Sequence, residues 1–97
     1  MKILAFSDLH LSSSQAVEIV AASAGADLVI GAGDFCNMRQ GLDRAVAMLA
    51  GLKAPMVAVP GNGESAGELR AAEFPGTTVL HGEGVDFEGL RLFGLGY

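Results

Sequence analysis

The sequence has little cysteine, few basic residues and no long apolar run. A single cysteine among 97 residues excludes a disulfide framework and any CxxC redox or zinc motif. Six basic residues against eleven acidic ones give a formal charge of −5, which argues against a nucleic-acid binder because such proteins need a basic face. No window of about 18 apolar residues is present to span a membrane. We therefore expect neither a nucleic acid nor a membrane as a partner.

What is present is a chain rich enough in apolar residues to fold. The hydrophobic fraction is 51% and the mean hydropathy is +0.42, which excludes disorder by composition. The apolar run Ile3–Phe6 is too short for a signal peptide, so we expect a cytoplasmic protein. The length predicts one small domain over residues 1–97. Because the C-terminal residues 93–97 are still apolar, we expect this domain to be a truncated part of a larger fold.

Short apolar runs alternate with helical patterns along the chain. Buried strands are predicted over 2–7, 27–32, 56–59 and 77–80, and a hairpin over 85–87 and 90–95. Helices are predicted over 12–24, 40–53 and 65–73. This β-α-β-α-β-α-β-β-β order indicates an α/β fold with a parallel sheet.

The first two predicted helices have recognisable starts, ends or apolar stripes. Ser12 and Gln15 form a capping box at the start of the first helix, and Gly25 follows its end. The stripe expected to be buried on that helix is Val17, Val20, Ala21 and Ala24. The corresponding stripe on the second helix is Leu42, Ala45, Val46, Leu49 and Leu52.

Polar residues follow the first three predicted strands, at the edge where open parallel sheets bind ligands. Asp8 and His10 come after the first strand, and in an extended loop residues two apart point the same way, so both could reach one cation. Asp34 follows the second strand and Asn62 the third. Each has a plainer interpretation: a turn or capping residue for Asp8, Asp34 and Asn62, and a surface histidine for His10. Their joint placement favours a metal site.

In this order, Asp8-Leu9-His10, Gly33-Asp34 and Gly61-Asn62-Gly63-Glu64 resemble the first three motifs of the calcineurin-like metallophosphoesterases. The resemblance implies the N-terminal half of an αββα sandwich with two divalent metal ions. By position, Asp8 and His10 would hold the first ion, Asp34 would bridge both, and Asn62 would hold the second. Mixed carboxylate, imidazole and amide ligands suit Mn, Fe or Zn, and the sequence does not choose among them.

The same resemblance implies hydrolysis of a small phosphoester, a diester or a monoester, by a metal-activated water. Asn37 and Arg39 follow the bridging motif and are candidates to contact the substrate phosphate. Asn37 could instead cap a helix, and Arg39 could belong to a solvated helix face.

Two departures from the family pattern leave the enzymatic activity open. Gly63 stands where many members carry a histidine that acts on the leaving group or the phosphate, and the C-terminal histidine ligands of the family are absent. The remaining histidine, His81, is interpreted as structural or partly exposed. Two alternatives follow: a metal-binding module without turnover that forms a homodimer through its unfinished sheet, and a phosphate- or nucleotide-binding α/β module. The second alternative is weaker because the Gly31-Ala32-Gly33 segment lacks a third glycine.

Overall fold

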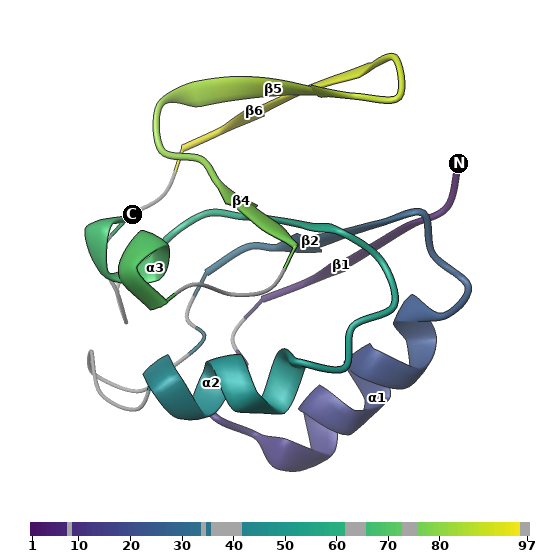
Figure 1. The fold of residues 1–97 in the computed structure, drawn as a ribbon, viewed down its shortest axis with the longest axis vertical. Coiled ribbons are helices and arrows are strands. Elements are labelled where there is room, and N and C mark those ends of the chain that lie inside the picture. Colours follow the sequence, from purple (N-terminus) through teal and green to yellow (C-terminus); the bar gives the residue numbers. More distant parts are fainter. Residues whose placement is uncertain (8, 34, 36–41, 62–65, 73–75, 96–97) are drawn as a thin grey trace.

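The computed structural model describes residues 1–7, 9–33, 35, 42–61, 66–72 and 76–95 (Figure 1). The elements, in order, are β1 (Ile3–Phe6), α1 (Ser13–Ser23), β2 (Leu28–Gly31), α2 (Leu42–Leu49), β3 (Met56–Ala58), α3 (Ala66–Ala72), β4 (Thr77–Val79), β5 (Glu83–Phe87) and β6 (Leu90–Gly94). The predicted element order is confirmed. Element bounds agree within two residues, except that α2 ends at Leu49 rather than near Lys53.

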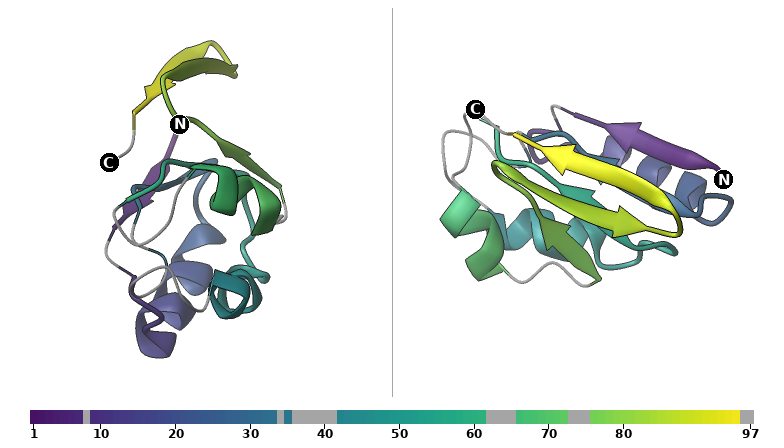
Figure 2. Two further views of the ribbon diagram at one scale, coloured as in Figure 1. Left: turned by 90° about the vertical axis from the view of Figure 1, so that its left-hand side faces the viewer. Right: turned by 90° about the horizontal axis from the view of Figure 1, so that it is seen from above.

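The first four strands form one parallel sheet in the order β1-β2-β3-β4. Because spatial order follows sequence order, every crossover moves one strand in the same direction, and right-handed crossovers then place all the helices on one face. Figures 1 and 2 show this arrangement, with the helices on one side of the sheet and the β5–β6 hairpin on the other. The α/β class with a parallel sheet is confirmed, and the added hairpin is consistent with the N-terminal half of an αββα sandwich.

The helix-covered face of the sheet contains the larger core. In each strand every second side chain points to this face. Val29 of β2 and Met56 of β3, which are partners in the sheet register, pack against the inner faces of the helices. The buried members of this cluster are Leu9, Ala16, Val29, Phe35, Ala45, Leu49, Met56, Ala58 and Leu69. Because β2 and β3 lie between neighbours and are covered on both faces, they read as continuous apolar runs in the sequence.

The opposite face packs against the hairpin through a smaller cluster. Leu28, Val57 and Leu80 are buried there, and the partly buried side chains of Val85 and Leu92 pack against them. In the hairpin, Phe87 pairs with Leu90 across a turn at Glu88 and Gly89. Both turn residues have positive φ, 47° and 84°, as a two-residue type I′ hairpin requires. The predicted hairpin is therefore confirmed.

The N-terminus of α1 is capped as predicted, because the Ser12 side chain accepts a hydrogen bond from the Gln15 N–H at 3.4 Å. Of the predicted stripe on this helix Val20 is confirmed, but the other three positions are wrong because the inward face is shifted by one residue. Val17 is 69% exposed, and Ala21 and Ala24 are also exposed. The inward face instead carries Ala16, Ile19, Val20 and Ser23.

Ser23 explains why the stripe shifts. Its hydroxyl donates to the Val20 carbonyl at 2.6 Å and accepts from the Lys53 N–H at 2.9 Å, so a fully buried polar residue has both of its hydrogen-bonding roles satisfied. On α2 the predicted stripe agrees with the structure: Ala45 and Leu49 are buried and Val46 is partly buried, while Leu52, which is also partly buried, follows the end of the helix. The side chain of Leu42 lies outside the described part. Among the described residues, no helix has the length and apolar character needed to cross a membrane.

Candidate functional site

The carboxyl ends of the four parallel strands meet at one edge of the sheet, which is where the sequence predicts the ligands. Of the four predicted ligands, His10 is described. The other three ligands, the two residues suggested to contact the substrate, and the glycine at the position of the family's histidine lie outside the described residues: Asp8, Asp34, Asn62, Asn37, Arg39 and Gly63. Their assignments stay predictions. The described residues around them show how the edge is built.

His10 sits in a tight turn. The Ser12 N–H donates to the Leu9 carbonyl at 2.9 Å, and the two central residues, His10 and Leu11, have φ of 45° and 60°. Positive φ at both central positions is the geometry of a type I′ turn. The extended backbone assumed for the Asp8–His10 spacing is therefore wrong at His10. Leu9 is 1% exposed and anchors the turn in the core, while His10 is exposed.

This turn is held by the loop that follows β2. The Leu11 N–H donates to the Phe35 carbonyl at 3.2 Å, which joins the loops after β1 and β2. Phe35 is fully buried and its ring meets that of Phe6 edge-on, with centroids 5.6 Å apart. Only glycine fits beneath this ring, because a Cβ at Gly31 would lie 2.6 Å from Phe35 Cζ. Aromatic packing therefore supports the left-handed backbone at His10, which costs about 1–3 kcal/mol per residue.

The loops after β2 and β3 touch through their backbones. Gly33 has φ of 98°, and a Cβ there would lie 2.7 Å from the Gly61 nitrogen and 2.8 Å from its Cα. A residue with a side chain fits neither this conformation nor this space. Asp34 and Asn62 are the next residues along the chain from these two glycines. The residues that directly precede the two predicted ligands are therefore in backbone contact with each other.

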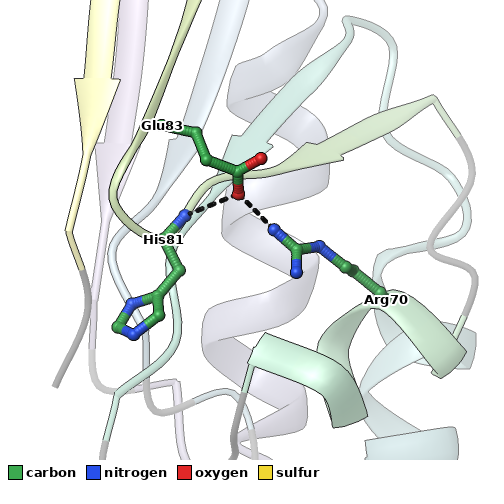
Figure 3. A network of polar contacts seen from close by, with 3 residues as sticks. All are labelled: Arg70, His81 and Glu83. Carbon is green, nitrogen blue, oxygen red and sulfur yellow. Dashed lines mark hydrogen bonds and ion pairs between the residues drawn. The ribbon is translucent and has the colours of Figure 1, made fainter.

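The loop after β4 carries the second imidazole of this edge. His81 is exposed, and its N–H donates to Glu83 Oε1 at 3.2 Å. The Arg70 guanidinium of α3 pairs with the same carboxylate oxygen (Figure 3). Sequence reasoning missed this link, because Arg70 and Glu83 belong to separate elements and no local pattern relates them.

The edge offers donors of the kind that divalent ions take, but the described part of the chain does not complete a centre by itself. Within it, no group of three or more histidine, cysteine, aspartate or glutamate side chains is close enough to hold a metal ion. The fit therefore rests on two features: the exposed His10 on a turn held by the loop after β2, and the close contact between Gly33 and Gly61, each of which is followed in the sequence by a predicted ligand.

The chain matches a known protein family. The model of the calcineurin-like phosphoesterase superfamily domain matches residues 1–93, a range that includes the three motif segments and nearly the whole hairpin. No curated protein matches the chain.

Proposed function

Since the chain belongs to the calcineurin-like phosphoesterase superfamily, a family of phosphoester hydrolases, we propose that residues 1–97 act as one domain that hydrolyses a phosphoester in a metal-dependent reaction. The observation that supports this proposal best is the Gly33–Gly61 backbone contact. It joins the two loops that carry the family's second and third motifs. The hydrogen bond from Leu11 to Phe35 joins the first motif loop to the second.

In this proposal Asp8 and His10 would hold one divalent ion, Asp34 would bridge two ions, and Asn62 would hold the second. The donor set is carboxylate, imidazole and amide, which suits Mn, Fe or Zn. When bound, such a pair of ions supplies a water activated for attack on phosphorus and a positive charge for the phosphoryl oxygens. The braced turn at His10 supports its role, because a ligand on a fixed backbone loses little entropy on binding.

The substrate in this proposal is a small phosphoester. Asn37 and Arg39 would contact its phosphate oxygens, since a guanidinium can donate two parallel hydrogen bonds to a phosphate. The formal charge of −5 fits the binding of cations at the edge better than the binding of a polyanion such as a nucleic acid.

The proposal is tested with protein that has been treated with a chelator and then supplied with Mn²⁺. We expect hydrolysis of a chromogenic phosphodiester or phosphomonoester, and a rise in Tm on addition of Mn²⁺. Asp34→Asn should lower turnover by about 100-fold or more and abolish the Tm rise, because it weakens the bridging ligand. Asp86→Asn is the matched control: Asp86 is exposed on β5 and should leave both readouts unchanged. Absence of turnover and of any Tm rise in the wild type would contradict the proposal.

A second candidate is a metal-binding module that self-associates and has no turnover. It is supported by exposed apolar side chains on β1 and at the end of the hairpin: Ile3 is 45% exposed, Phe93 71% and Leu95 70%. This candidate predicts metal-induced stabilisation without hydrolysis, together with a dimer in native mass spectrometry.

A further inference from the structure

The proposed hydrolysis needs a proton at the oxygen that leaves phosphorus. When that P–O bond breaks, an alkoxide or phenoxide forms, and a nearby acid that protonates it typically accelerates the reaction by about 10²–10⁴-fold. The resemblance to the family places a histidine for this work at the position of Gly63, and glycine cannot transfer a proton. Resting on the proposed function, we propose that His81 is the residue that protonates the leaving group.

His81 lies beside the strand that leads into Gly63. β4 pairs in parallel with β3, with Ala58 opposite Val79. The Leu80 N–H donates to the Ala58 carbonyl at 2.8 Å, so the pairing continues past the last strand residue. Counted from the Ala58–Val79 pair, Pro60 and His81 are each two residues further along the sequence. Pro60 is three residues before Gly63 in the sequence, and His81, an exposed residue, follows β4 at the edge of the sheet where the substrate is proposed to bind.

The backbone that carries this imidazole is held at three successive amides. The Leu80 N–H donates to the Ala58 carbonyl, the His81 N–H to Glu83 Oε1, and the Gly82 N–H to the Gly94 carbonyl at 2.7 Å. Leu80 is also 3% exposed and anchors the segment in the hairpin-side cluster. Because the backbone is fixed, only the two side-chain torsions of His81 determine where its ring lies. A proton donor needs a ring position that is defined in this way.

Glu83 and Arg70 act as positioning residues in this assignment. The Oε1 atom of Glu83 is engaged by the His81 amide and by the Arg70 guanidinium, which reaches it from α3. Figure 3 shows the imidazole pointing away from Arg70, so the carboxylate fixes the backbone of His81 while its ring extends elsewhere. Arg70 and Glu83 thereby hold the backbone of His81 in place.

The proton balance of the step is simple. The attacking water forms a new P–O bond and releases one proton to solvent, while the bond from phosphorus to the leaving oxygen breaks. The imidazolium of His81 gives its N–H proton to that oxygen, which leaves as an alcohol or phenol. The neutral imidazole then takes a proton from solvent, which restores the acid for the next turnover. The net reaction consumes one water.

The test compares leaving groups. A nitrophenolate departs without protonation, whereas a simple alkoxide needs a proton. With Mn²⁺ present, His81→Gln should lose less than about 10-fold in kcat on a nitrophenyl phosphoester but about 10²–10⁴-fold on the methyl phosphoester of the same type. Arg91→Gln, on the exposed face of β6, is the control and should keep both rates. His81→Ala serves as a second variant with the same expectation.

A second readout separates this role from a structural one. The Mn²⁺-induced rise in Tm should be the same in His81→Gln as in the wild type, because His81 is not proposed to hold an ion. Equal losses on both substrates, or no loss on either, would overturn the role of His81 while leaving the proposed function standing. A wild type that hydrolyses neither substrate would overturn the proposed function, and the role of His81 with it.

Discussion

The sheet with its helices and the β5–β6 hairpin are packed very differently. On the helix side, buried side chains come from strands, helices and loops alike, and Phe35, Leu49 and Leu69 are almost fully enclosed. On the hairpin side, Leu28, Val57 and Leu80 are the buried apolar residues among those described, and the hairpin covers them with partly buried side chains. The hairpin also leaves Phe93 71% exposed. Stability therefore resides mainly in the sheet and its helices.

The difference bears on the candidate site. The turn at His10 and the Gly33–Gly61 contact belong to the sheet and its helices, where Leu9 and Phe35 anchor them. His81 lies between the two regions, since its backbone neighbours bond to β3 on one side and to the hairpin on the other. We therefore expect substitutions that loosen the hairpin to disturb the position of the His81 backbone more than they disturb the loops proposed to bind metal.

The largest expected effect comes from a matched pair of leucine truncations. Leu49→Ala removes a 2% exposed side chain from the helix-side core and should lower the free energy of unfolding by about 2–5 kcal/mol. Leu92→Ala removes a partly buried side chain of β6 and should cost about 1 kcal/mol. Urea denaturation measures both, with unchanged slopes as the check on two-state behaviour. Equal costs would show that the hairpin is as firmly packed as the helices.

A second pair compares two glycines with positive φ. Gly89→Ala, in the hairpin turn, meets nothing within 4 Å and suffers only the strained φ of 84°, a cost of about 1 kcal/mol. Gly33→Ala adds a clash with the Gly61 backbone and should cost about 2–3 kcal/mol. Because the clash separates the loops leading to Asp34 and Asn62, it should also reduce the Mn²⁺-induced rise in Tm. If Gly33→Ala behaves like Gly89→Ala in both measurements, the glycine contact does not shape the site.

Most of the fold could be predicted from the sequence because its signals are local. Apolar runs bounded by glycine and proline mark the strands, and the Ser12 cap marks the start of α1. The inward face of α1 could not be predicted in the same way. Alanine and valine occur on several sides of this helix, so more than one stripe looks apolar in the sequence. Which stripe faces inward depends on the hydrogen bonds of Ser23 with Val20 and with Lys53, which is 30 residues away.

The sequence motifs predict which residues belong to the candidate site, but not the backbone conformation of the loops that carry them. The order of the motif residues indicates a common edge, which the parallel sheet confirms for the strands that lead to them. The turn at His10 carries no glycine or asparagine to signal positive φ, and its conformation is supported instead by the long-range bond from Leu11 to Phe35. The link between Arg70 and Glu83 is equally invisible, because it depends on where α3 and β5 come together in the fold.

The smallest expected effect concerns that link, which joins α3 to the hairpin. Arg70 and Glu83 are each about half exposed, at 50% and 51%, so Arg70→Gln should lower the free energy of unfolding by less than about 1 kcal/mol. Added salt screens an exposed ion pair, so the difference from wild type should shrink further at about 1 M NaCl. Arg91→Gln removes a still more exposed arginine, 3.5 Å from Asp86, and should change stability even less. A loss of several kcal/mol in Arg70→Gln that persists in high salt would mean that the hairpin is held mainly by this pair, and that the packing of Leu80 against Val85 and Leu92 contributes little.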